Sequence, residues 1–220
     1  MTNVSPETYG QLRARFGDLP DSPLISLAFA YVRDRMPPFL FNHVARCWVF
    51  AVKLGAMRNF AYDAEVVAVA TLLHDLGLTD HADGPNRFEV NGAFIAAAFV
   101  RNHGFDDRRT QLVWDSVALH ATPSIGFLKE PEVALCGRGV TVDFGGPDYA
   151  DFRPEDIDAV VQAMPRLDMK RQFSGCLCHL ARTRPETTYD NIARDFGERY
   201  VPGYKAPSWV DRLLGGPFEE

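Results

Sequence analysis

Apolar residues recur every three or four positions along most of the chain, and the strict alternation typical of strands is absent over any useful length. This period predicts helices almost throughout. Proline and glycine mark several ends: Ser5-Pro6 and Ser22-Pro23 look like helix starts, and Gly17 and Gly77 look like helix stops. We expect helices over residues 5–16, 24–36, 39–59, 64–77, 88–104, 106–122 and 130–146, the last loosened by its two glycines, and then near 155–164, 168–182, 186–196 and 207–214.

The predicted fold is therefore all-α. The chain has 220 residues and no internal repeat or low-complexity tract, so we expect one domain over residues 1–220. Its core would cover roughly residues 22–145, and residues 148–220 would form a helical extension.

Composition removes several classes of partner. The net charge of −6 gives no reason to expect nucleic acid, which is normally met by clustered Lys and Arg. No apolar run approaches the roughly 20 residues that a membrane span needs, and the N-terminus lacks the pattern of a secretory signal. With four cysteines expected to be reduced thiols, we predict a soluble, cytoplasmic protein that acts on a small molecule without nucleic acid or membrane.

The doublet His74-Asp75 is the first candidate for chemistry. It ends an apolar helix whose buried stripe includes Val67, Ala70 and Thr71. Adjacent helical residues point about 100° apart, so such a pair reaches one metal ion only from a helix end beside that ion. Burying an imidazole and a carboxylate is costly without partners, and a metal ion supplies one.

His43 and Asp143 complete a candidate metal site. His43 shares the buried face of its predicted helix with Cys47, and Asp143 closes another apolar helix. Any one of these residues alone is more often an ordinary core histidine or a turn cap. Together, His43, His74, Asp75 and Asp143 form a nitrogen and oxygen ligand set that suits one divalent ion, with zinc our first choice and iron, manganese or nickel as alternatives.

This order of residues resembles the H…HD…D pattern of the HD metal-dependent hydrolase superfamily, over roughly residues 25–145. The dipeptide alone is unspecific, but here it stands in Leu72-Leu73-His74-Asp75-Leu76-Gly77 after an apolar run. The resemblance implies a single HD-type helical bundle with the metal at its centre.

The chain departs from the motifs of other superfamily members at two places, and these differences indicate which branch it resembles. Nucleotide-cleaving and cyclic-dinucleotide members carry an acidic residue or a lysine after the doublet, where this chain has Leu78 and Thr79. Dinuclear members, including diiron oxygenases, add a histidine where this chain has Phe88, although His103 and His120 leave a second metal open. The closest resemblance is to the cyanamide hydratase group, through His74–Thr79, Phe88–Gly92, Leu119-His120 and Val142-Asp143.

This resemblance implies a mononuclear lyase or hydrolase that hydrates a small nitrile such as cyanamide through hydroxide on the metal. Asp75 would serve the reaction as a ligand, and Glu89 and His120 are the candidates for proton transfer. Glu89 has an equally good alternative as an ordinary acidic residue of a first helical turn. The polar loop from Thr79 to Arg87 would act as a lid.

Other functions remain as alternatives: an HD phosphohydrolase acting on a nucleotide, a dinuclear iron oxygenase, and a binding protein that has lost catalysis. A homo-oligomer stays open, because Tyr200, Tyr204 and Trp209 could pack on the core or on a second subunit. Cys176, Cys178 and His179 do not favour zinc, since neighbouring thiols on a helix point to different faces.

Overall fold

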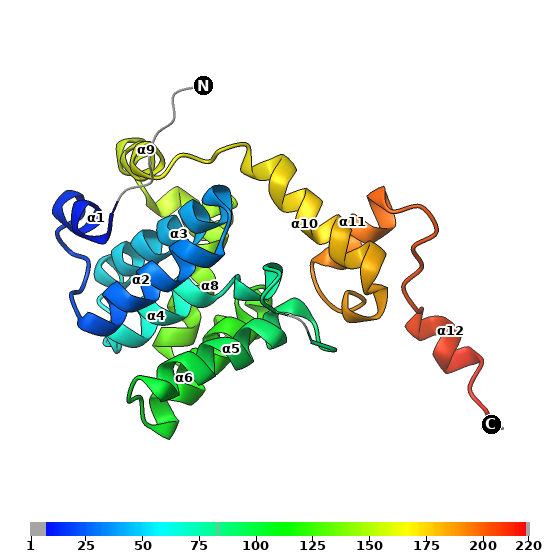
Figure 1. Ribbon diagram of the computed structural model, residues 1–220. Helices are drawn as coiled ribbons and strands as arrows, with labels where there is room; N and C mark the ends of the chain where they lie inside the picture. The colour runs from blue at the N-terminus through cyan, green and yellow to red at the C-terminus, as the bar shows by residue number, and fades with distance from the viewer. Residues whose placement is uncertain (1–7, 83, 219–220) are drawn as a thin grey trace. The chain divides into compact units, whose positions relative to one another are not determined.

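The computed structural model describes residues 8–82 and 84–218, and these residues contain helices and turns but no strand (Figure 1). The all-α prediction is thus confirmed. Contacts divide the chain into two compact units, Met1–Met169 and Lys170–Glu220. The α-helices of the first unit are α1 (Tyr9–Arg15), α2 (Pro23–Arg35), α3 (Pro38–Met57), α4 (Ala64–Leu73), α5 (Phe88–Asn102), α6 (Asp107–Leu119), α7 (Pro123–Gly126), α8 (Pro131–Asp143) and α9 (Pro154–Ala163), with short 3₁₀ helices η1 (Leu76–Leu78) and η2 (Pro147–Asp151).

Helix α3 forms the centre of the first unit. It is apolar on all faces, and nearly every residue from Phe39 to Gly55 is buried, as expected for a helix surrounded by others. Helix α4 is equally buried from Val66 to Leu73. A polar side chain in the buried part of α3, such as His43, therefore has no route to solvent and must find its partners inside the protein.

Helices α3 and α8 lie side by side and approach closely at Gly139 (Figure 1). A Cβ atom there would overlap the Cys47 carbonyl oxygen and lie 2.9 Å from the Cβ of Ala51. Gly139 thus allows α8 to pack directly against the backbone of α3, and it does not loosen α8. This corrects the expectation from sequence, since α8 runs unbroken to Asp143.

The helix ends follow local capping chemistry. Helix α1 begins at Tyr9 because Thr8 and Gln11 form a reciprocal capping box. The expected start at Ser5-Pro6 lies outside the described residues. Helix α2 begins as predicted, with the Ser22 side chain accepting a hydrogen bond from the Ile25 backbone N–H.

The second unit contains α10 (Met169–Thr183), η3 (Pro185–Thr187), α11 (Ala193–Tyr200) and α12 (Trp209–Leu214). The helix expected over residues 186–196 is displaced, because α11 starts only at Ala193. Tyr204 packs against Gly197, and its hydroxyl lies 2.7 Å from the Thr188 hydroxyl. Trp209 is 78% exposed, so of the C-terminal aromatics Tyr204 has a packed place and Trp209 does not.

Among the described residues, no helix combines the length and apolarity required to cross a membrane.

Candidate metal centre

His74 and Asp75 lie where α4 ends and the chain turns into η1. His74 keeps helical backbone angles as the C-terminal cap of α4, whereas Asp75 departs from them with φ −99° and ψ 14°. This change of direction brings the two side chains together: His74 Nε2 lies 3.3 Å from Asp75 Oδ2. The doublet therefore occupies the helix end that its sequence predicted, and both residues are buried.

Two histidines at two helix ends are held in the same way. The Nδ1 atom of His74 lies 2.7 Å from the Thr71 carbonyl oxygen, and Nδ1 of His120 lies 2.6 Å from the Val117 carbonyl oxygen. A carbonyl only accepts, so each Nδ1 carries the proton and donates it. In the neutral form of each ring, Nε2 is then the nitrogen with a lone pair, and that of His120 lies 3.6 Å from Asp75 Oδ1.

His43 approaches the same carboxylate from the N-terminal third of α3. Its Nε2 lies 3.4 Å from Asp75 Oδ2. On the other side of the ring, Nδ1 lies 2.7 Å from Oδ2 of Asp143, the last residue of α8. The close crossing at Gly139 brings these two helices near enough for that contact.

Asp143 is clamped by two arginines. Arg46 donates from Nε to Oδ1 at 2.7 Å and from Nη2 to Oδ2 at 2.8 Å, and Arg166 donates from Nη1 to Oδ1 at 2.9 Å. Arg46 is itself fully buried and also donates to the Met164 carbonyl oxygen. The predicted ligand Asp143 thus belongs to an ion-pair network on the outer side of His43.

Arg46 and Arg166 were missed from the sequence. Arg46 did leave a signal, because it is a charged residue three positions after His43 in an otherwise apolar helix, where only a buried anion would stabilise it. Arg166 follows α9 in a turn, and nothing in its local sequence indicates a partner.

We call the group made by His43, His74, Asp75, His120 and Asp143 the metal-facing cluster. Burial and its two carboxylates set the pKa values of its side chains. Burial lowers the pKa of His43 even though Asp143 opposes the change, and burial with neighbouring His74 lowers that of His120 to about 3. Burial also acts to lower the pKa of His74, but the adjacent Asp75 carboxylate outweighs it and the pKa is raised. Burial acts to raise the pKa of Asp75, yet His74, His43 and His120 together hold it well below its ordinary value.

Three atoms of the cluster test whether a metal ion fits. Nε2 of His74 and both carboxylate oxygens of Asp75 are buried and have no hydrogen-bond partner among the described residues. Each such atom costs about 1–3 kcal/mol if it stays unsatisfied. His74, Asp75 and His120 each present one ligand atom within 4.8 Å of the others, so one cation among them would satisfy His74 Nε2 and an oxygen of Asp75.

A second grouping, His43, Cys47 and His74, shares His74 with the first. The only ring nitrogen that His74 can offer is Nε2, because Nδ1 donates to Thr71, and one lone pair serves one ion. Burial raises the pKa of the Cys47 thiol well above its ordinary value, which makes it a poor ligand. The described residues therefore favour one ion. Phe88, buried and packed 5.8 Å from the His120 ring centroid, stands beside that histidine.

Glu89, a predicted proton-transfer residue, is buried in the first turn of α5. Its carboxylate accepts hydrogen bonds from Arg87 Nε at 3.1 Å and Nη2 at 2.7 Å. The start of α5 also touches the doublet's turn directly, since a Cβ atom on Gly77 would overlap the Phe88 carbonyl oxygen, and one on Gly92 would lie 3.0 Å from the Gly77 nitrogen. The two motif segments, predicted from separate stretches of sequence, thus meet backbone to backbone.

The remaining candidates lie elsewhere. His103 caps α5 and donates from Nδ1 to the Phe99 carbonyl oxygen at 2.7 Å, and His81 is exposed. Cys176 and Cys178 lie on α10, and neither belongs to the two groupings above. Asn91 of α5 donates hydrogen bonds to the carbonyl oxygens of Gly84 and Asn86, which lie in the loop proposed as a lid.

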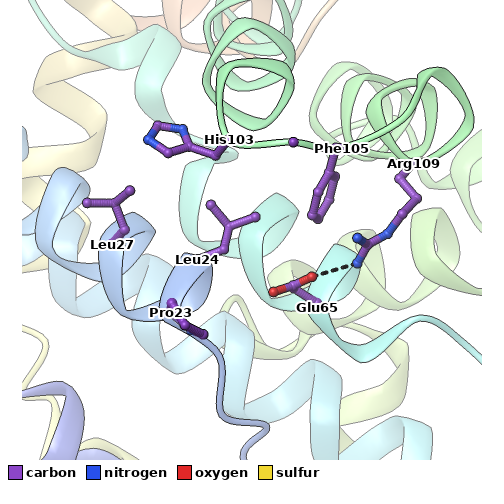
Figure 2. A pocket seen from close by; sticks show the side chains of 8 residues that line it. Pro23, Leu24, Leu27, Glu65, His103, Phe105 and Arg109 are labelled. Carbon is purple, nitrogen blue, oxygen red and sulfur yellow. Dashed lines mark hydrogen bonds and ion pairs between the residues drawn. The ribbon is translucent and has the colours of Figure 1, made fainter.

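A surface pocket of about 310 Å³ lies between α2 and the turn that joins α5 to α6 (Figure 2). Its charged groups are already paired: Arg109 bonds Glu65 at 2.7 Å and Asp63 at 2.8 Å. None of its residues belongs to the metal-facing cluster. Its lining consists of Pro23, Leu24, Leu27, Glu65, His103, Gly104, Phe105 and Arg109.

Comparison with known proteins agrees with this geometry. The family model described as "HD domain" matches residues 40–168, which include the whole cluster from His43 to Arg166. No curated protein matches the chain.

Proposed function

The chain belongs to the HD domain family, and from this premise we propose that it is a metal-dependent enzyme that adds water to a small nitrile such as cyanamide. The family and the buried His–Asp cluster support the metal-dependent hydrolase class. The nitrile is the finer proposal, and zinc is the first choice of metal. The observation that carries the proposal is that His74 Nε2 and both Asp75 oxygens are buried without a hydrogen-bond partner among the described residues, in a grouping of His74, Asp75 and His120 that could hold a metal ion.

The arginines of the cluster argue against a phosphate substrate. Cleavage of a phosphate ester needs cationic donors that are free to hold its oxygens. Both guanidinium groups that reach this cluster, those of Arg46 and Arg166, are already bound to Asp143. The rings that border the cluster, Phe88 and Phe144, are apolar, which favours a small uncharged substrate.

The reaction proposed is the addition of one water molecule across a carbon–nitrogen triple bond. A divalent ion, when bound, supplies a Lewis acid and lowers the pKa of water toward neutrality. A bond forms between water oxygen and the nitrile carbon while one π bond of C≡N breaks. One water proton moves to the nitrogen, and the second follows as the imidate tautomerises to the amide, so that cyanamide gives urea.

The residues of the chain divide this work. His74 and His120 are fixed by their Nδ1–H bonds to backbone carbonyls, so their Nε2 atoms stay directed toward the Asp75 carboxylate. Asp75 contributes negative charge, since its lowered pKa keeps it ionised at neutral pH. We assign the transfer of the proton from oxygen to nitrogen to the Glu89 carboxylate, which Arg87 holds by two hydrogen bonds.

The test combines metal analysis with a substrate panel. Purified protein is analysed for metal per chain and then assayed with cyanamide, aliphatic nitriles and nucleoside monophosphates. About one zinc per chain and amide formation support the proposal. Phosphate release without amide formation overturns it in favour of a phosphohydrolase, and two irons per chain overturn it in favour of an oxygenase.

We propose a cytoplasmic location and no nucleic-acid or membrane partner, on the composition of the chain. Self-association is checked by light scattering on the same preparation.

A further inference from the structure

The two buried carboxylates of the cluster differ in how far their oxygens are already used. An ionised carboxylate offers about four lone-pair positions. Asp143 receives four donors: Arg46 Nε and Arg166 Nη1 on Oδ1, and Arg46 Nη2 and His43 Nδ1 on Oδ2, all at 2.7–2.9 Å. Both oxygens of Asp75, by contrast, have no hydrogen-bond partner within residues 8–82 and 84–218.

The surroundings of Asp143 also oppose a cation. Two guanidinium groups lie within 2.9 Å of its oxygens, so a metal ion there would meet two positive charges as well as a filled acceptor. Arg46 is fully buried and is also held by the Met164 carbonyl oxygen, so it cannot move aside without leaving its charge unpaired.

His43 is arranged to use this carboxylate. Because Nδ1 faces Asp143 at 2.7 Å, that nitrogen carries the proton, and Nε2 presents its lone pair toward Asp75 at 3.4 Å. A carboxylate that accepts from the far nitrogen of a histidine fixes its ring and tautomer and raises its basicity as a ligand.

We infer that Asp143 is a positioning residue that acts through His43, and that the ion is held by His43, His74 and His120, each through Nε2, together with Asp75. His120 enters this set because its Nδ1 is blocked as that of His74 is, and because its Nε2 lies 3.6 Å from the free Oδ1 of Asp75. This inference rests on the proposed function, since it needs a metal ion at the cluster. It differs from the ligand set that the sequence motif predicts, in which Asp143 binds the ion and His120 moves protons.

The first experiment uses the wild-type chain, so it does not depend on a variant that folds. The protein is labelled with ¹⁵N-histidine and loaded with ¹¹³Cd²⁺, and one-bond ¹¹³Cd–¹⁵N couplings are counted. The inference expects three coupled Nε2 atoms and a protonated Nδ1 on His43. Two coupled histidines overturn the inference but leave the proposed metal enzyme standing. Failure to bind about one cadmium per chain overturns both.

The second experiment is a double-mutant cycle read as Cd²⁺ affinity by chelator competition. Asp143→Asn should weaken binding about 10–100-fold, the usual effect of losing such an outer partner. Added to His43→Ala, it should cause no further loss, because its effect passes through His43. Additive losses would identify Asp143 as a direct ligand and overturn the inference.

Asp148→Asn is the matched control for this cycle. Asp148 is also buried and also held by two arginines, Arg58 and Arg138, but lies in η2 outside the cluster. It should destabilise the fold in a thermal melt and leave Cd²⁺ affinity unchanged. An equal loss of affinity in this variant would show that the effect of Asp143→Asn is only structural.

Discussion

The ring of Phe144 packs against the ring of His43, with centroids 5.2 Å apart and planes at 62°. His43 is fully buried, whereas Phe144 is 51% exposed, so this contact joins the metal-facing cluster to the surface of the first unit. An aromatic ring in that position is suited to restrict what reaches His43.

Phe144→Ala should therefore relax substrate selection. We expect kcat/KM for an aromatic nitrile to rise several-fold relative to cyanamide, with metal content unchanged. Phe94→Ala is the control, because Phe94 is similarly exposed but makes its edge-to-face contact with Trp114. If both variants keep the wild-type preference, Phe144 does not select the substrate.

Replacing either member of the doublet should remove the metal. His74→Ala or Asp75→Ala takes away a buried ligand atom that has no hydrogen-bond partner among the described residues, so metal per chain and turnover should both fall to background. His103→Ala should retain both, since His103 makes the same kind of Nδ1 bond to a carbonyl as a helix cap elsewhere. Elemental analysis decides, and full metal content in either doublet variant would refute the site.

Glu89→Gln should keep the metal and lose turnover by about 100-fold or more, the usual size of general acid–base catalysis. Its ion pair with Arg87 offers a purely structural alternative. Arg87→Gln breaks the same pair and leaves the carboxylate in place, so it should cost much less activity. Equal losses in the two variants would assign Glu89 to structure alone.

Gly77→Ala should damage the site through the backbone. The new Cβ would overlap the Phe88 carbonyl oxygen, and backbone atoms cannot move aside as a flexible side chain does. We expect a loss of about 1–3 kcal/mol in the free energy of unfolding, together with weaker metal binding. Gly175→Ala, in α10 with nothing within 4 Å of the new Cβ, should be neutral or slightly stabilising, and urea unfolding measures both.

Metal binding should release a proton near neutral pH. In the metal-free protein Asp75 outweighs burial and raises the pKa of His74, so this histidine takes up a second proton more readily than an ordinary histidine, and a metal ion must displace that proton. His120, with a pKa of about 3, and His43, with its pKa lowered by burial, are already neutral. Affinity should accordingly fall about tenfold for each pH unit below the pKa of His74. Calorimetry in buffers of different ionisation enthalpy measures the protons released, and a value of zero would contradict this account.

The helical period predicted most elements of the first unit and the burial of His43, His74 and Asp75, because these depend on local spacing. The helical period did not predict that Asp143 is paired with arginine side chains. Arg46 and Asp143 are 97 positions apart, and their pairing depends on how closely α3 and α8 pack at Gly139. The start of α11 was misplaced because Pro185 opens only a short 3₁₀ turn.

Three helices of the first unit run toward the cluster with the same polarity. Helix α4 ends at His74, α6 ends at His120, and α8 ends at Asp143. The C-terminus of a helix carries the equivalent of about half a negative charge from its aligned peptide dipoles. The backbone thus supplies negative potential beside Asp75, whose carboxylate oxygens accept no hydrogen bond from the part of the chain that the structure describes, so a divalent cation is favoured there by the direction of the chain as well as by its side chains.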